Sequence, residues 1–157
     1  MNGIAPTVAP LSETVAATWQ EQTQITGRAL GLTERAEQVV ADTEARFAEA
    51  RAANPEFAGK TLAAGFVVGG ETYALGTDDL RTQLFSDLGF TLPATSTTLS
   101  RELLGELDKD VLVVLGESRA AAEADQQLAA LRVVRDGRVA YLGEHLEVRR
   151  RGRRCRS

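Results

Sequence analysis

The chain has 157 residues, of which 43% are hydrophobic and 25% charged, and its formal net charge is −4. This length and composition predict one globular domain with a core of its own. No apolar run approaches the roughly 20 residues that span a bilayer. Cys155 has no partner for an internal disulfide, and His145 lacks the neighbouring ligands of a zinc site.

The N-terminal segment MNGIAPTVAP carries neither the basic region nor the apolar region of a signal peptide, so the chain as written is expected to stay in the cytoplasm. Its prolines predict an extended segment over residues 1–10. Good helix formers follow from Leu11 to about Leu30, with Ser12 as the expected N-cap. Gly31 is expected to end this helix.

A second helix is predicted between Thr33, its expected N-cap, and Pro55, which stops it. Apolar residues recur within it at helical spacing and form one stripe: Ala36, Val40, Thr43 and Phe47. Placed end to end, the two helices would reach about 45 Å at 1.5 Å per residue. Residues 11–58 are therefore predicted to form a long, rigid helical connector.

From Gly59 onward strands alternate with helices, which predicts an α/β lobe over residues 59–148 with a doubly wound, mainly parallel sheet. The unbroken apolar run Val111–Leu115 is typical of a strand buried on both faces. The other strands are expected at 61–68, 72–75, 90–92 and 138–142, with a polar loop at 94–98 and helices at 79–88, 100–107 and 120–131.

Residues 149–157 read RRRGRRCRS, with six arginines and no acidic residue. An arginine-rich arm on an acidic body is one kind of nucleic-acid or membrane contact. Here neither aromatic residues nor a Gly-Arg repeat accompany the arginines, and the apolar register stops abruptly before them. We interpret the tail as an aberrant, out-of-frame end and expect no nucleic-acid partner.

Several segments, taken together in their order and spacing, resemble one family of receptors: IAPTV, WQEQT, ALGLTERAEQVVADTEARFAEARA, GTDDLR, DLGF, DVLVVLG and RDGRVAYL. Over residues 4–143 the chain is similar to the periplasmic iron–siderophore substrate-binding proteins of ABC importers. These receptors have two α/β lobes joined by a long backbone helix, and the ligand is held between the lobes. The resemblance implies that this chain is a fragment, with the connector and most of the C-terminal lobe.

The resemblance also implies a function without chemistry: binding of an anionic ferric siderophore for iron uptake, with no cofactor and no enzymatic activity. The partner would be an ABC permease, which an exposed glutamate such as Glu71 or Glu106 would contact. Membrane contact would come only through the permease or a missing lipid anchor. The full-length parent, a lipoprotein, is expected in the periplasm or on the outer face of the cell membrane.

Arg81 is the first candidate for ligand contact, because a guanidinium pairs bidentately with carboxylate or catecholate oxygens and stays charged. It follows a strand at the start of a helix, where anions are favoured. The alternative is a surface arginine paired with Asp78 or Asp79, and helix capping explains these two carboxylates more simply than acid–base chemistry. Tyr73, on the preceding strand, either donates to the ligand or is a half-buried strand residue.

Gly70 lies in a Gly-Gly turn and is expected to allow a tight turn near the ligand. Glu117 and Ser118 follow the buried strand at its carboxyl end, where open α/β sheets place ligands, and are candidates for ligand contact. Trp19 is expected to pack the connector helix against a lobe rather than face the cleft. No metal site and no catalytic residue are predicted.

Two alternatives stay open. A receptor of the same fold for haem or cobalamin is one, and a haem ligand would come from Tyr73, Tyr141 or His145. The other is a small α/β protein-interaction domain that docks through its long helix. An enzyme is disfavoured because the sequence offers no nucleophile–base pair, and GGETYALG lacks the Lys-Ser/Thr pair of a P-loop.

Overall fold

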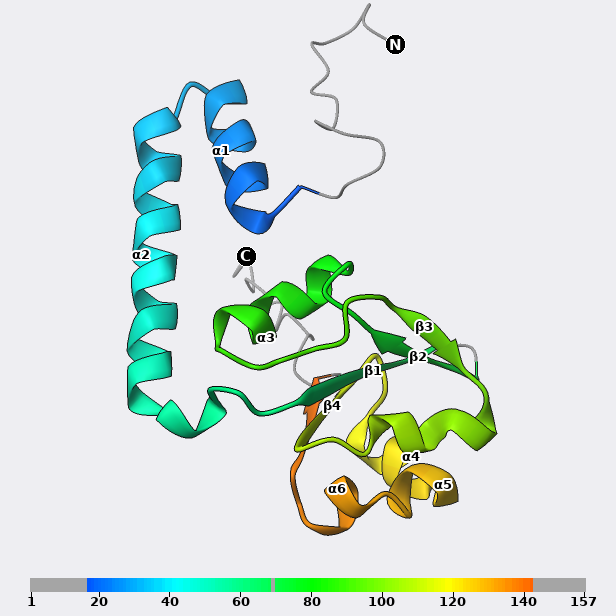
Figure 1. The fold of residues 1–157 in the computed structure, drawn as a ribbon. Helices are drawn as coiled ribbons and strands as arrows, with labels where there is room; N and C mark the ends of the chain where they lie inside the picture. Colours follow the sequence, from blue (N-terminus) through cyan, green and yellow to red (C-terminus); the bar gives the residue numbers. More distant parts are fainter. Residues whose placement is uncertain (1–16, 69, 143–157) are drawn as a thin grey trace, which may run out of the picture. The chain divides into compact units, whose positions relative to one another are not determined.

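The computed structural model describes residues 17–68 and 70–142 (Figure 1). They form two compact units, each described here by itself. The first unit contains residues 17–60 and 76–95, and the second contains 61–68, 70–75 and 96–142. The predictions for residues 1–10, Ser12, His145 and the tail 149–157 lie outside the described residues.

The first unit begins with helix α1, Trp19–Ala29, which a reciprocal pair of hydrogen bonds caps. Thr18 Oγ1 accepts from Glu21 N at 3.2 Å, and the Thr18 backbone N–H donates to Glu21 Oε2 at 2.8 Å. This capping box satisfies donors that the first turn leaves unpaired. Residues 17 and 18 are not helical and α1 begins at Trp19, whereas the part of the predicted helix over residues 11–16 lies outside the described residues.

Helix α2, Thr33–Ala53, follows after a turn in which Gly31 takes a φ of 69°, as predicted for a residue that ends a helix. Thr33 is the first residue of α2 and not its cap, because Leu32 holds the cap position. The predicted stripe is confirmed: Ala36 and Val40 are buried, while the more exposed positions flank them.

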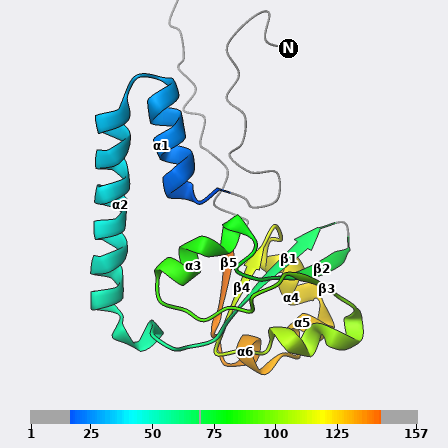
Figure 2. The ribbon, with the colours of Figure 1, turned by 45° about the horizontal axis from the view of Figure 1, so that its top comes forward.

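Helices α1 and α2 lie side by side as a hairpin, which both views of the ribbon show (Figures 1 and 2). A Cβ added to Gly27 would lie 2.3 Å from Ala36 Cβ, so this glycine permits the close approach of the two backbones. The rings of Trp19 and Phe47 pack across the pair with centroids 6.4 Å apart. The expected end-to-end rod of about 45 Å is therefore wrong, because the turn at Gly31 reverses the chain.

The rest of the first unit packs against this hairpin through polar contacts. Short helical turns cover Pro55–Phe57 and Leu80–Thr82, and helix α3 covers Gln83–Asp87. Trp19 Nε1 donates to Asp87 Oδ2 at 3.1 Å, which joins α1 to α3 within this unit. The packing of the connector against a lobe through Trp19 stays a prediction. The predicted strand 90–92 is wrong, since only Thr91 forms a single bridge there.

The second unit is built on a five-stranded sheet with the order β3-β2-β1-β4-β5. β1 pairs in parallel with β4, and β4 with β5, whereas β2 runs antiparallel to β1 and β3. The α/β class and the mainly parallel direction are confirmed, because four of the five strands point the same way. The strands are β1 Leu62–Val68, β2 Glu71–Leu75, β3 Thr97–Leu99, β4 Val111–Leu115 and β5 Val139–Leu142.

Short helices cover one face of this sheet and close the core (Figure 1). They are the 3-10 helix Arg101–Leu107, α4 Arg119–Ala124, α5 Gln126–Ala129 and α6 Arg132–Arg135. Leu107, Leu112 and Val133 are at most 1% exposed in this core. None of the described helices combines the length and the apolarity needed to cross a membrane.

Two sequence predictions in this unit are wrong. The helix expected over 120–131 is divided at Asp125, whose Oδ1 accepts from Gln127 N at 2.9 Å and starts α5 as a new helix. The polar loop expected at 94–98 contains the start of β3, whose threonines pair with Tyr73 and Ala74.

Candidate binding site

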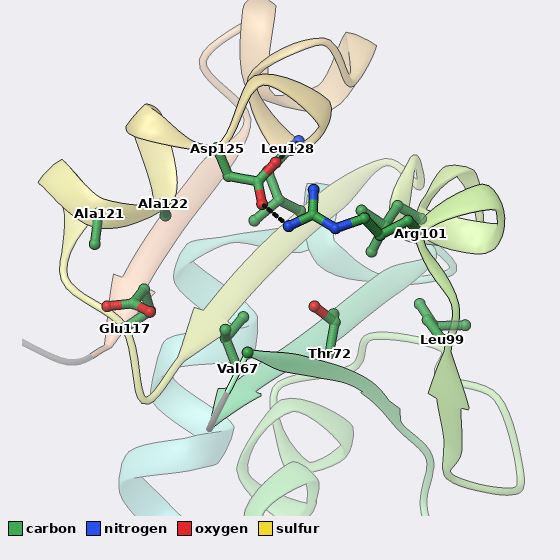
Figure 3. A pocket seen from close by; sticks show the side chains of 11 residues that line it. Val67, Thr72, Leu99, Arg101, Glu117, Ala121, Ala122, Asp125 and Leu128 are labelled. Atoms are coloured by element: carbon green, nitrogen blue, oxygen red, sulfur yellow. Dashed lines mark hydrogen bonds and ion pairs between the residues drawn. The ribbon is translucent and has the colours of Figure 1, made fainter.

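A pocket of about 190 Å³ lies at the carboxyl edge of the sheet in the second unit (Figure 3). Three strands lead into it: β1 is followed by Gly70, β3 by Arg101 and β4 by Glu117. The carboxyl edge is where open α/β sheets bind ligands. The side chains that complete the walls are Val67, Thr72, Leu99, Leu104, Ala121, Ala122, Asp125 and Leu128.

Glycines shape the turns that bring these residues together. Gly70 has a φ of 83° between β1 and β2, and Gly116 has a φ of 79° directly after β4. A Cβ on Gly116 would lie 2.8 Å from Phe66 Cε2 and 3.0 Å from the carbonyl oxygen of Val67. Only glycine fits this position without strain, and the tight turn brings Glu117 to the rim of the pocket.

Charged and apolar side chains line the pocket together (Figure 3). Arg101 Nη1 donates to Gln127 Oε1 at 3.1 Å, and Arg101 Nη2 lies 3.8 Å from Asp125 Oδ2. Glu117 Oε1 accepts from the backbone N–H of Ser118 at 3.2 Å. The pocket therefore has a cation, two carboxylates and an apolar base, which can bind a small ligand but form no nucleophile–base pair.

The predicted residues of the second unit divide between two positions. Gly70 and Glu117 line the pocket together. Ser118 follows Glu117 and caps α4, since its Oγ accepts from Ala121 N at 3.1 Å. Tyr73 lies on the other face of the sheet, because it alternates with Thr72, which lines the pocket.

The Tyr73 hydroxyl donates to the carboxylate of Glu71. This hydrogen bond, together with the negative charge of Glu71, raises the pKa of Tyr73 above its usual value of 10.0. The ring packs against Phe66 with centroids 6.4 Å apart. The hydrogen bond and the ring contact both fit the second of the two interpretations of Tyr73 given above, a half-buried residue of a strand.

Arg81 belongs to the first unit and makes a bidentate pair with Asp79. Its Nε donates to Asp79 Oδ1 at 2.9 Å and its Nη2 to Oδ2 at 2.7 Å. The hydrogen bonds from Arg81 lower the pKa of Asp79 below 3.8 and raise the pKa of the guanidinium. Asp79 Oδ1 also accepts from Arg81 N at 2.9 Å, so the predicted capping role of Asp79 is confirmed.

Sequence reasoning missed Arg101, Asp125 and Thr72 as pocket residues. Arg101 looked like an ordinary surface residue of a helix because β3, which ends just before it, was not recognised. Asp125 looked like a mid-helix residue. The available signal for Asp125 was its residue type, since aspartate favours helix starts over helix interiors. Among the described residues, no three His, Cys, Asp or Glu side chains gather closely enough to hold a metal ion.

Comparisons with known proteins match the chain to a family of binding proteins. Residues 2–145 match the family described as periplasmic binding protein. A search of curated proteins found no match. A periplasmic solute binding protein from Mycobacterium smegmatis is 28% identical with a TM-score of 0.78, over 90% of this chain and 52% of that chain.

Two more distant structures share the fold. The binding component of a ferrichrome ABC transporter from Bacillus subtilis is 21% identical with a TM-score of 0.70, over 88% of this chain and 58% of that one. FhuD2 from Staphylococcus aureus with bound ferrioxamine B is 17% identical with a TM-score of 0.68, over 89% and 60%. The chain thus spans about half the length of the Mycobacterium protein and somewhat more of the other two.

Proposed function

Because this chain belongs to the periplasmic binding protein family, we propose that it is part of the substrate-binding component of an ABC importer and binds an anionic ferric siderophore for iron uptake. The match over residues 2–145 is the observation that carries the proposal. Structural neighbours support the ligand class, since their names include a ferrichrome transporter component and a ferrioxamine B complex. The chain would supply the helical connector and one of the two lobes that enclose the ligand.

Arg81 is the residue proposed to meet the anionic oxygens of the chelate. Its side chain is 47% exposed, so the guanidinium is open to solvent while Asp79 fixes its orientation. A guanidinium keeps its charge at every working pH, which suits equilibrium binding of an anion. Asp79 offsets part of that charge, so the net attraction for the ligand depends on how the anion competes with the carboxylate.

The remaining proposed contacts lie in the second unit. Gly70, Glu117 and Ser118 are at or beside the carboxyl edge, where the fold class places ligands. Tyr73 would contribute through its ring or hydroxyl, and its hydrogen bond to Glu71 holds that hydroxyl in place. A pocket of about 190 Å³ is below the roughly 300–1,000 Å³ of ordinary ligand sites, so this lobe would provide one wall of a larger cleft.

The partner and the location follow from the same proposal. An ABC permease would receive the ligand, and an exposed glutamate would contact it. Glu71 and Glu106 are the candidates, and Glu106 Oε2 lies 3.5 Å from Lys109 Nζ. The parent protein would act in the periplasm or on the outer face of the cell membrane, bound to the membrane only through the permease or a lipid anchor.

The test uses a two-lobed protein in which this chain replaces the matching half of the Mycobacterium smegmatis structure. Isothermal titration with a ferric tricatecholate siderophore is expected to give saturable binding, and the iron-free siderophore should bind more weakly. Arg81→Gln should weaken binding by about tenfold or more, since one charge-assisted contact is lost. Arg46→Gln, which removes an exposed arginine of the same unit, is the matched control.

Two results would refute the proposal. One is the absence of binding for ferric tricatecholate, ferric hydroxamate and ferric carboxylate siderophores alike. The other is tight binding of haemin or cobalamin by the same protein, with a Soret band in the case of haemin. Equal losses in Arg81→Gln and Arg46→Gln would leave the ligand class standing but refute the assignment of Arg81.

A further inference from the structure

The pocket of the second unit has unused hydrogen-bonding groups of opposite charge on its rim. Glu117 is one of them. Its Oε1 accepts from Ser118 N at 3.2 Å, while no donor from the described residues reaches its Oε2. The side chain lines the pocket and is half-buried (Figure 3). A carboxylate placed there favours a ligand that brings a positive, hydrogen-bonding group.

Arg101 is the group of opposite charge on the rim. Its Nη1 donates to Gln127, and its Nη2 faces Asp125 at 3.8 Å, which is an ion pair beyond hydrogen-bond length. Its Nε finds no acceptor among the residues that the structure describes. Asp125 directs its other oxygen to the start of α5, where Gln127 N and Leu128 N donate to it. The guanidinium therefore keeps donors for an incoming carboxylate.

The floor between these groups is apolar. It consists of side chains that the core already holds in place, and its three leucines are at most 7% exposed: Leu99, Leu104 and Leu128. Val67 and Ala122 complete it. A volume of about 190 Å³ suits a molecule of amino-acid size rather than a drug-sized one. Such a floor favours methylene groups over further polar groups.

We propose that this pocket binds a small linear zwitterion, a molecule with a carboxylate and an ammonium group joined by a short methylene chain. Arg101 receives the carboxylate, Glu117 receives the ammonium group, and the methylenes cover the apolar floor. Both charged ends are needed, because Asp125 offsets Arg101 and leaves a simple anion with little net attraction. The proposal does not rest on siderophore binding, and its ligand contains no metal.

The test is isothermal titration of the full chain with glycine, γ-aminobutyrate, δ-aminovalerate and ε-aminocaproate. One chain length is expected to bind saturably and best, since Arg101 and Glu117 follow two different strands of one sheet and the ligand must span the separation between them. Valerate and pentylamine each carry only one of the two charges. They should bind about tenfold or more weakly than the best zwitterion, because each lacks one charge-assisted contact.

Variants assign the two contacts. Glu117→Gln keeps the shape of the side chain and removes its charge, while Arg101→Gln removes the guanidinium and leaves a polar side chain. Each should weaken zwitterion binding by about tenfold or more. Asp136→Asn removes an exposed carboxylate of the same unit outside the pocket, and zwitterion binding should not change. Circular dichroism checks that every variant is folded, and the comparison of ligands on the unmodified chain does not depend on the variants.

The proposal is overturned if no member of the series binds at about 10 mM, far above the concentrations of specific recognition. It is also overturned if valerate or pentylamine binds as tightly as the best zwitterion. Unchanged binding in both Glu117→Gln and Arg101→Gln would contradict it equally, since the charged rim would then play no part.

Discussion

Gly116→Ala is expected to destabilise the second unit strongly. The backbone at this position has a φ of 79°, which costs an L-residue roughly 1–2 kcal/mol. The new Cβ would also lie 2.8 Å from Phe66 Cε2 and 3.0 Å from the Val67 carbonyl oxygen. Forcing atoms into a packed site costs about 1–3 kcal/mol more. The two effects together predict a loss of about 2–5 kcal/mol.

Gly137→Ala separates these two effects. Gly137 has a similar φ of 70°, but a Cβ there would meet no heavy atom within 4 Å. Only the backbone cost of roughly 1–2 kcal/mol should appear. Urea unfolding followed by circular dichroism measures both variants, and the difference between them gives the steric cost. If Gly116→Ala loses no more free energy of unfolding than Gly137→Ala, the close approach of β1 to this turn is refuted.

Three further predictions follow from the core and from the titrating groups. Leu112→Ala should lower the free energy of unfolding by about 2–5 kcal/mol in urea denaturation, because Leu112 is 0% exposed on β4, which lies between β1 and β5. A loss under about 1 kcal/mol contradicts this burial. Asp79→Asn should reduce stability at neutral pH, because the folded-state pKa of Asp79 is lowered by its hydrogen bond with Arg81. In urea melts the difference from the unmodified chain should be complete above the usual carboxyl pKa of 3.8 and should disappear as the pH falls from that value through the lower folded-state pKa. A difference that persists at still lower pH refutes the ion pair as its source. Glu71→Gln should lower the pKa of Tyr73 toward 10.0, because the hydrogen bond to Glu71 and the charge of Glu71 raise that pKa. The pKa is measured from tyrosinate absorbance in a Tyr141→Phe background, in which Tyr73 is the one remaining tyrosine. An unchanged pKa of Tyr73 contradicts that contact.

The sheet was largely predictable from the sequence because its strands carry strong local signals. The run Val111–Leu115 has no polar residue, and the structure places it as β4 between two parallel neighbours. The Gly-Gly pair that ends in Gly70 predicted that the segment 72–75 either continues the strand 61–68 or pairs with it, and the structure shows the pairing of β1 with β2. In both cases the residues of one short segment are enough to predict the local structure: an unbroken apolar run predicts a buried strand, and a Gly-Gly pair predicts a turn.

The α1–α2 hairpin was not predictable in the same way. Gly31 predicts the end of α1, but the direction of the next helix depends on the contact of Gly27 with Ala36. The division of the helix predicted over 120–131 has a similar origin. The alanine-rich sequence favours one continuous helix, but Asp125 caps α5 through Gln127 N and lies 3.8 Å from Arg101 Nη2, and these two contacts favour a break. Local helix propensity yields to tertiary contacts in such cases.

The candidate site was predicted in part. Gly70 was identified from the tight turn that a Gly-Gly pair allows. Glu117 was identified because it follows a strand at its carboxyl end, a rule that needs no knowledge of side-chain contacts. Arg101 obeys the same rule but follows β3, a strand of three residues with a weak signal. The pairing of Arg81 with Asp79 could be foreseen from their spacing, whereas its bidentate geometry comes only from coordinates.

Hydrogen–deuterium exchange on the two-lobed protein tests most directly whether the carboxyl edge of the sheet is the ligand-binding face. With saturating ferric tricatecholate, slowed exchange is predicted in the turns at 67–73 and 115–118. The turn at 108–110, which precedes β4 at the opposite edge, should exchange at an unchanged rate. Protection confined to 108–110, or no ligand-dependent protection in either carboxyl-edge turn, would contradict the account.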